Sequence, residues 1–407
     1  MKFIKSFRFK PILLSACSIV TGLSRHRFFN RESEVKSLVH QVTENHPGLI
    51  LVTGPPDSGK TSVLKKVMEE SKSSCRWFHM DMRQPGNSWD DIPSIYTSLY
   101  MAFAIGRNNT MSIRALEFTA DILEWFTFKI KLWWNKDKPP KTELDVKKLL
   151  LTVEKKMIRK KRSWYPGKRY TPVLFLDEAN HMYGKLDKTE EGKNILECFM
   201  EFIHRNTKQN ENFHVILASS SSMFVRRIMK DSLSRSSVIV IGDLSKEHAQ
   251  EYWQWLEKEE GKSCSVQFDK VFEKVGGHMF DLRRVFMALE PEEELSQMIA
   301  VAQTNLTSLI VPTPSKNPEK PELGWTKEQG EEVVNGIRLH GYMEVRPLRE
   351  KHGDDMIDEM VKEHVVCYRP GPVWKDDLNL PENVEFPIIT APTPLHLWVL
   401  KEKFKEN

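Results

Sequence analysis

The chain has 407 residues, of which 40% are hydrophobic and 29% charged, a composition that is ordinary for a soluble globular protein of two or three domains. Its five cysteines are scattered and form no CxxC pair, which argues against a disulfide or zinc framework and for a reducing compartment. The net charge of +4 neither requires nor excludes nucleic acid, and every apolar run is shorter than the ~18 residues of a transmembrane segment.

Residues 1–27 form a basic N-terminal segment in which lysines and arginines alternate with serines and no acidic residue occurs. This composition is compatible with a mitochondrial or plastid transit peptide. The apolar run at 12–20 could instead be a signal-peptide core, although unpaired cysteines argue against secretion. An untargeted tail is the third interpretation. The expected location is therefore intracellular, either in such an organelle or in the cytoplasm.

The folded part is expected to begin at Phe28. A helix follows in which Val35, Leu38 and Val42 recur at helical spacing, until Pro47 and Gly48 end it.

Residues 48–66 contain the most specific motif of the chain. A short apolar strand, Leu49–Val52, enters a loop that reads GxxxxGK[ST] and continues into helical sequence. The glycines let successive backbone N–H groups face a phosphate, Lys60 at an exposed loop end would reach the β- and γ-phosphates, and the Thr61 hydroxyl would bind Mg²⁺. The predicted nucleotide-binding residues are Gly54, Pro55, Pro56, Asp57, Ser58, Gly59, Lys60, Thr61 and Ser62. A glycine-rich turn without nucleotide is disfavoured by the strand before it and the Lys-Thr pair after it.

The next part of the chain carries fewer signals. Trp77–Met82 reads as a second strand, and 94–134 reads as an inserted helical layer whose aromatic stripe favours a core over a membrane-surface role. After a loop at 135–142 comes a helix with apolar residues from Val146 to Met157. Its basic end, Lys155–Arg162, is either a solvated face or a contact for a nucleic-acid backbone.

A fully apolar strand, Val173–Leu176, is followed directly by Asp177 and Glu178. Ligands of open α/β sheets bind at the carboxyl ends of the strands. Asp177 is therefore placed to bind Mg²⁺ together with Thr61, and Glu178 to orient or deprotonate an attacking water. Two solvated carboxylates would be the alternative, which the presence of the phosphate-binding motif disfavours.

Two further strands are predicted at Phe213–Ala218, before a run of four serines, and at Val238–Ile241, after a helix at 192–206. Strands that alternate with helices in this way predict a doubly wound parallel sheet. From there the chain reads as helical to about residue 310, with Gly276 and Gly277 as the main interruption.

Residues 312–324 hold four prolines and read as a linker. Beyond it come a helix at 326–339, a helical segment ending near Lys362, a strand at His364–Tyr368, a second extended stretch at Val384–Ile389 and a terminal helix from Pro394. This order is that of a winged-helix module, although other small α+β domains share it.

Together these motifs resemble an AAA+/STAND-type P-loop ATPase of the archaeal-type group. The run Phe28–Glu34 is similar to the entry motif of that group, Trp77–Arg83 to its second strand, and Val215–Met223 to its sensor-1 strand. The resemblance implies that Ser219 contacts the γ-phosphate or the water. It also implies that Arg283 is the sensor-2 arginine of a lid, although Met279 and Phe280 depart from the family patterns.

The same resemblance implies an arginine finger at Arg235, which STAND members often lack. It also implies an ATPase core at 28–244, a helical lid at 245–311, the linker, and a winged-helix-like domain at 325–407. The expected function is an ATP- and Mg²⁺-dependent switch that acts on a protein partner or forms a homo-oligomer through its C-terminal domain. The alternative is a nucleic-acid loader or remodeller.

Overall fold

The computed structural model of the protein describes residues 28–44, 46–83, 142–161, 170–183, 188–232, 236–310, 324–371, 380–381 and 383–404. The N-terminal segment 1–27, the expected helical layer at 94–134, nearly all of the linker 312–324, and Arg235 lie outside these ranges. Predictions about them stay predictions.

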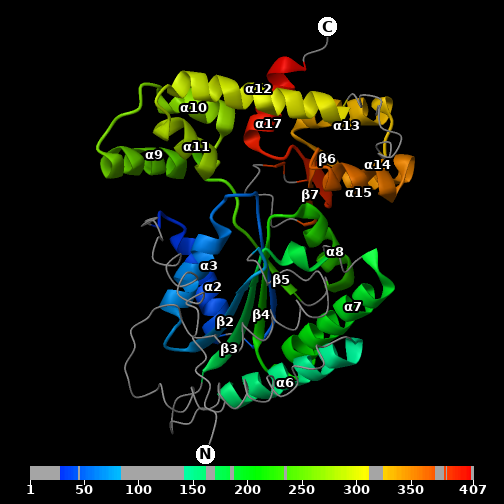
Figure 1. Cartoon of the computed structure of the whole chain (residues 1–407). Coiled ribbons are helices and arrows are strands. Elements are labelled where there is room, and N and C mark those ends of the chain that lie inside the picture. Colours follow the sequence, from blue (N-terminus) through cyan, green and yellow to red (C-terminus); the bar gives the residue numbers. More distant parts are fainter. Residues whose placement is uncertain are drawn as a thin grey trace, which may run out of the picture.

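A five-stranded parallel sheet forms the lower half of the molecule (Figure 1). Its strands are β1 (Leu49–Thr53), β2 (Cys75–Asp81), β3 (Thr171–Asp177), β4 (His214–Ser219) and β5 (Ser236–Val240), in the spatial order β2-β3-β4-β1-β5. All four pairings are parallel. The predicted doubly wound α/β sheet of a P-loop NTPase is thus confirmed.

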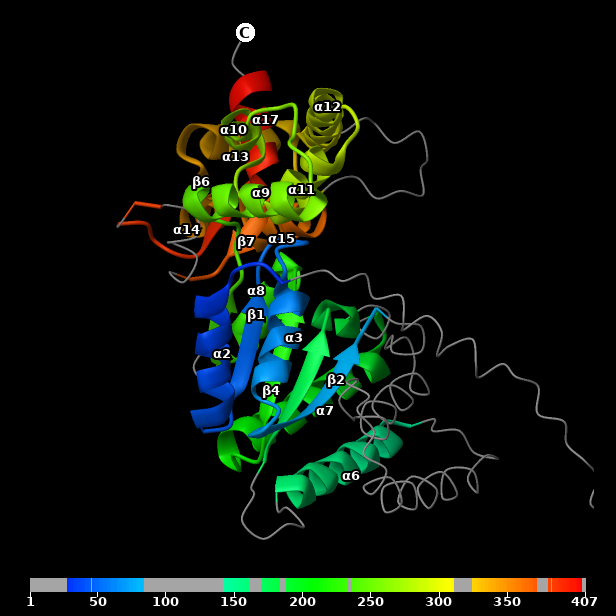
Figure 2. The same cartoon turned by 90° about the vertical axis from the view of Figure 1, so that its left-hand side faces the viewer.

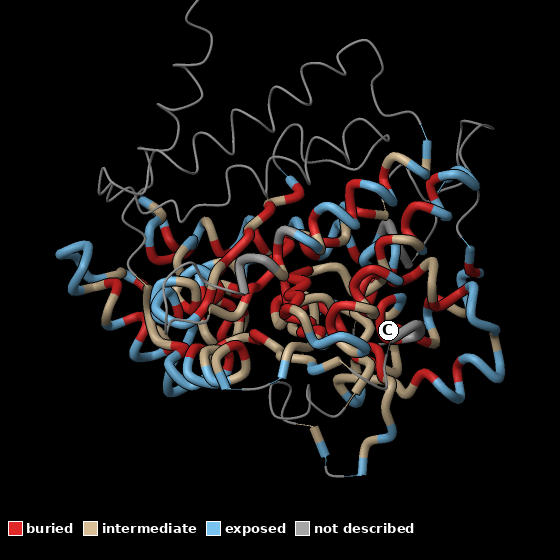
Figure 3. The backbone as a smooth tube through the Cα atoms, turned by 90° about the horizontal axis from the view of Figure 1, so that it is seen from below, coloured by how far each residue is buried: buried red, intermediate tan, exposed pale blue. Residues whose placement is uncertain are grey.

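Helices cover both faces of this sheet. One face is packed by α2 (Glu32–Glu44) and α3 (Lys60–Glu70), and the other by α6 (Glu143–Lys161), α7 (Glu190–His204) and α8 (Ser222–Ser232). Short turns η2 (Ala179–Tyr183) and η4 (Arg205–Gln209) follow β3 and α7. Because successive strand residues face opposite sides, Leu49 and Leu51 of β1 join one core cluster and Ile50 and Val52 the other. The buried residues accordingly lie in the interior of the molecule, and the exposed residues lie toward its outside (Figure 3).

The upper half of the molecule contains the lid and the C-terminal domain (Figures 1 and 2). The lid helices are α9 (Lys246–Glu260), α10 (Phe268–Val275), α11 (Met279–Met287) and α12 (Pro291–Ile310). The C-terminal elements are α13 (Lys327–His340), β6 (Tyr342–Glu344), α14 (Val345–His352), α15 (Asp354–Lys362), β7 (Cys367–Arg369), β8 (Ile388–Thr390) and α17 (Pro394–Lys403). Their three strands form an antiparallel sheet in the order β6-β8-β7.

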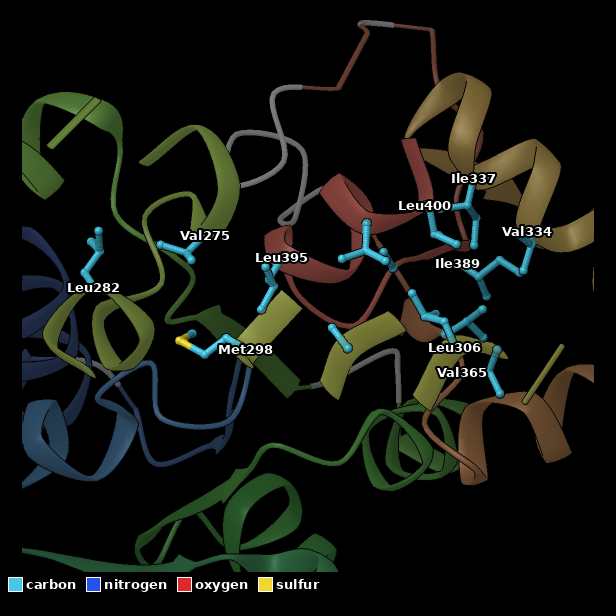
Figure 4. Packing of buried hydrophobic residues seen from close by; sticks show 14 of the residues in the cluster. Val275, Leu282, Met298, Leu306, Val334, Ile337, Val365, Ile389, Leu395 and Leu400 are labelled. Atoms are coloured by element: carbon cyan, nitrogen blue, oxygen red, sulfur yellow. The ribbon is translucent and has the colours of Figure 1, made fainter. Parts of the chain in front are cut away.

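Lid and C-terminal domain share one hydrophobic cluster rather than holding separate cores. Helix α17 contacts α10, α12 and α13, and Leu395 and Leu400 of α17 belong to the same cluster as Val275 and Met298 of the lid (Figure 4). We therefore propose that lid and C-terminal domain behave as one body, the upper body, although the sequence divides them at a linker.

Three elements differ from expectation. The strand predicted at His364–Tyr368 begins only at Cys367, because His364 has a left-handed φ of 59° and lies in the turn before it. Strand β6 and helix α8 were not predicted. None of the helices in the described ranges is long and apolar enough to cross a membrane.

Candidate nucleotide-binding site

The phosphate-binding loop connects β1 to α3 at the carboxyl edge of the sheet, beneath the upper body (Figure 2). Gly54 lies against the segment that follows β5, and a Cβ on it would come within 2.1 Å of the Ile241 carbonyl oxygen. Only glycine therefore fits there. Asp57 and Gly59 have left-handed φ values of 57° and 94°, and Gly59 caps the start of α3. The predicted strand–loop–helix context is confirmed.

Lys60 is buried, although an exposed loop end was expected. Its ammonium group folds back and donates hydrogen bonds to the carbonyl oxygens of Pro55 at 2.6 Å and Gly54 at 3.2 Å. Burial lowers the pKa of Lys60 to about 8, against the raising effect of Glu178 and other nearby carboxylates. The charge is thus held at the centre of the loop, where phosphate oxygens would replace the carbonyl acceptors.

Thr61 and Asp177 come together as predicted for a metal pair. The Thr61 hydroxyl donates to Asp177 Oδ2 at 2.8 Å, and Asp177 is buried at the end of β3. A hydroxyl and a carboxylate are hard oxygen ligands of the kind that Mg²⁺ binds, and Mg²⁺ takes its remaining ligands from phosphate and water. The residues therefore fit the cation. The described ranges hold no cluster of three or more His, Cys, Asp or Glu side chains that could bind a metal without such a substrate.

Glu178 follows β3 in an uncommon backbone conformation. Its φ of 52° lies in the left-handed region, and its N–H donates to Asp177 Oδ1 at 3.1 Å. A residue other than glycine, asparagine or aspartate is rare at such a φ, and such strain is concentrated at functional sites. Strand β3 ends at Asp177, so Glu178 is the first residue of the turn that follows.

Arg83 is a site residue to which the sequence assigned no role. It lies just after β2, the sheet neighbour of β3, and its guanidinium is 3.7 Å from Asp177 Oδ2 and 3.6 Å from Glu178 Oε1. It also pairs with Asp81 at 3.2 Å. Asp81 is in register with Asp177 across the two strands, so sheet order, which sequence does not reveal, brings the arginine to these carboxylates.

Ser219 ends β4 and is also directed at the carboxylate strand. Its hydroxyl donates to Asn180 Oδ1 at 2.8 Å and accepts the N–H of Ser221 at 3.0 Å. Asn180 lies on η2, three residues after Asp177, and was not predicted as a site residue. The neighbouring strands β3 and β4 thus place the predicted sensor serine beside the turn that follows the predicted metal ligand Asp177 and the predicted catalytic Glu178.

The lid arginines occupy different surroundings. Arg283 on α11 is half-buried. Burial raises the pKa of the Tyr252 phenol on α9, and the nearby charge of Arg283 partly offsets this effect. Arg284 is exposed and pairs with Glu294. A lid side chain that lies at hydrogen-bond distance from the phosphate-binding loop is His278, whose Nε2 is 2.9 Å from the Pro56 carbonyl oxygen. The sensor role of Arg283 stays a prediction.

The chain is similar to several known proteins. An uncharacterized ATP-binding protein of Methanocaldococcus jannaschii is 24% identical over 271 residues, which cover 63% of this chain and 72% of that protein. An uncharacterized ATP-binding protein of Pyrococcus abyssi is 27% identical over 233 residues, covering 54% of this chain and 62% of that protein. The solved structure of a Walker-type ATPase of Pyrococcus abyssi aligns over 93% of this chain and 97% of its own, with 14% identity and a TM-score of 0.47.

The family described as "ATPase domain predominantly from Archaea" matches residues 28–285, from the aromatic pair before α2 to near the end of α11. This range takes in the phosphate-binding loop, the carboxylate strand, the predicted sensor strand and most of the predicted lid. The chain therefore belongs to this family of ATPase domains.

Proposed function

We propose that the protein hydrolyses Mg·ATP and uses the nucleotide to switch the position of its upper body. The observation that carries this proposal is the convergence of Thr61, Asp177, Glu178 and Ser219 at one edge of the sheet, below the lid. Lys60 would bind phosphate, Thr61 and Asp177 would hold Mg²⁺, and Glu178 would position or deprotonate the attacking water. The cation, when bound, would neutralise phosphate charge.

The C-terminal domain supports a winged-helix assignment. Its element order, α13-β6-α14-α15-β7-β8, with a three-stranded sheet in the order β6-β8-β7, fits such a module. In a DNA-binding helix-turn-helix, the second helix of the pair enters the major groove, and α15 holds that place here.

Helix α15 faces the ATPase core instead. Asp354 and Asp358 of α15 form ion pairs with Arg226 of α8, and the Arg226 guanidinium lies 5.3 Å from the ring centre of Tyr368 on β7. Helix α8 begins three residues after Ser219. A change at the sensor serine would therefore move the helix on which the C-terminal domain is docked. This connection from Ser219 through α8 to α15 supports a STAND-type switch. In such a switch the nucleotide would change the contact of the C-terminal domain with a protein partner or a second copy.

The charge of α15 argues against the nucleic-acid alternative. The helix carries Asp354, Asp355, Asp358 and Glu359 against a single lysine, Lys362. The basic side chains of α14 are themselves paired with carboxylates: Arg346 with Glu350 and Glu385, Arg349 with Asp354, and Lys351 with Glu332. Such a surface would repel a phosphate backbone.

Phosphate release from ATP, measured with and without Mg²⁺ and with and without duplex or single-stranded DNA, tests the proposal. We expect Mg²⁺-dependent turnover that Lys60→Ala removes and that nucleic acid leaves unchanged. Size-exclusion chromatography in ATP and in ADP would reveal a nucleotide-dependent change in shape or assembly. Strongly salt-dependent DNA binding that stimulates turnover would favour the loader instead, and absence of nucleotide binding would refute both.

A further inference from the structure

His278 contacts the phosphate-binding loop, and the ATP binding and hydrolysis proposed above do not require this contact. His278 is buried at the N-terminal end of α11. Its Nε2 lies 2.9 Å from the Pro56 carbonyl oxygen and its Nδ1 2.8 Å from Asp281 Oδ2. The Pro56 carbonyl oxygen can only accept a hydrogen bond, so Nε2 donates to it, while Nδ1 faces the Asp281 carboxylate at ion-pair distance. A carboxylate so close favours the protonated, imidazolium form of the ring.

The surroundings favour that charge. Burial alone lowers the pKa of His278, but the hydrogen bond to Asp281 and the charge of Asp243 outweigh it and raise the pKa to about 9. Asp243 follows β5 and is half-buried, and its buried Oδ1 has no hydrogen-bond partner among the described residues. The other charged or titratable groups nearby are Arg31 before α2, Arg369 on β7 and His396 on α17, whose pKa burial lowers.

The backbone holds His278 at this place. A Cβ on Gly277 would lie 1.8 Å from the Leu244 carbonyl oxygen, and the Gly277 carbonyl accepts the Leu244 N–H at 3.0 Å. The turn before α11 is thus fixed to the start of the lid, and only glycine fits there. His278 is therefore a rigid extension of the upper body and not a mobile surface side chain.

The orientation of the Pro56 carbonyl matters for anion binding. In a planar trans peptide the C=O and the following N–H point in opposite directions. A Pro56 carbonyl that is held toward His278 therefore turns the Asp57 N–H away from His278, so the contact fixes the orientation of a backbone N–H in the phosphate-binding loop.

We propose that His278 is a positioning residue that fixes the phosphate-binding loop in its anion-binding shape through the Pro56 carbonyl, and so couples loop conformation to the upper body. This inference rests on the proposed nucleotide binding and adds its regulation. Since the contact acts on the loop rather than on the γ-phosphate, it should favour ADP and ATP equally. The sensor role predicted for Arg283 would favour ATP alone.

The test compares the affinity of the full chain for a fluorescent ADP and a fluorescent ATP analogue from pH 6.5 to 10, for the wild type, His278→Ala and Arg284→Ala. At pH 6.5 we expect His278→Ala to bind both nucleotides about tenfold more weakly, the scale of a lost charged hydrogen bond. Arg284→Ala, which removes an exposed neighbour on the same helix, should match the wild type.

The pH profile separates a charge effect from a merely structural one. The pKa of His278 is raised from 6.5 to about 9. The excess nucleotide affinity of the wild type over His278→Ala should therefore be complete below pH 6.5 and should be lost as the pH rises through 9. Titration of Lys60 affects both proteins and cancels in the ratio of their affinities. Should His278→Ala fail to fold, Asp281→Asn serves instead: removing that carboxylate should move the inflection to lower pH.

A ratio that stays constant from pH 6.5 to 10, or a loss confined to ATP, would overturn the inference while leaving nucleotide binding intact. Failure of the wild type to bind either nucleotide would overturn the proposed function and this inference with it. Equal losses for His278→Ala and Arg284→Ala would also overturn it, because Arg284 is exposed and pairs with Glu294 on α12.

Discussion

Removing Arg226 should loosen the docking of the upper body on the ATPase core. The Arg226 side chain is only 12% exposed, whereas its partners Asp354 and Asp358 are 51% and 41% exposed. Solvent screening at the carboxylates limits each ion pair to about 0.5 kcal/mol. The contact with the Tyr368 ring adds about 1 kcal/mol, more than about 0.5 for a fully exposed pair, because the guanidinium is largely desolvated. Arg226→Ala should therefore cost about 2 kcal/mol, or about 30-fold in the docking equilibrium.

Hydrogen exchange of backbone amides in α8 and α15, followed by mass spectrometry, measures this directly, because exchange of amides shielded by docking scales with the population of the open form. Arg346→Ala is the matched control: its ion pairs with Glu350 and Glu385 lie within the C-terminal domain and do not reach the core. If both variants accelerate exchange equally, the reasoning about Arg226 is wrong. In a double-mutant cycle, Arg226→Ala and Asp358→Asn should be non-additive, since they remove the same contact.

Three further predictions concern the chemistry of the site. Lys60→Ala should abolish nucleotide binding, and wild-type ATP affinity in this variant would refute the assignment of the phosphate-binding loop. Because the buried ammonium also bonds to two loop carbonyl oxygens, the melting temperature without nucleotide should fall by a few degrees. Glu178→Gln should keep binding but slow turnover by about 10²-fold or more, whereas Asp177→Ala should also weaken the dependence on Mg²⁺; turnover within a few-fold of the wild type would exclude Glu178 as the water-positioning group. Arg283→Ala should reduce the preference for ATP over ADP in equilibrium binding, with Arg284→Ala as its control, and equal effects of the two would show that the sensor is misplaced.

The sequence predicted those features that depend on local pattern. The apolar runs before Gly54, Asp177 and Ser219 are buried on both faces of a parallel sheet, and such strands read as continuous hydrophobic segments. Helix α8 was missed because a run of serines reads as a turn, and β6 because three residues carry too little periodic signal.

Contacts between segments that are far apart in the chain could not be predicted from the sequence. Lys60 was expected at an exposed loop end, yet it is buried and donates hydrogen bonds to carbonyl oxygens of its own loop. Arg83 reaches Asp177 only because β2 and β3 are neighbours in the sheet. His278 contacts Pro56 across 222 residues of chain, a distance that no local pattern reports.

The cluster shared by the lid and α17 has a consequence for synthesis of the chain on the ribosome. All strands of the parallel sheet are made before residue 241, so the core can fold while translation continues. The lid helices follow at once, but Leu395, Val399 and Leu400, which complete their apolar packing, lie on α17 and are made only after the whole C-terminal sheet. The hydrophobic face of the nascent lid therefore stays uncovered until α17 has been made. A premature stop after α15 would leave that face uncovered, and the defect would appear at the nucleotide site as well as at the C-terminus.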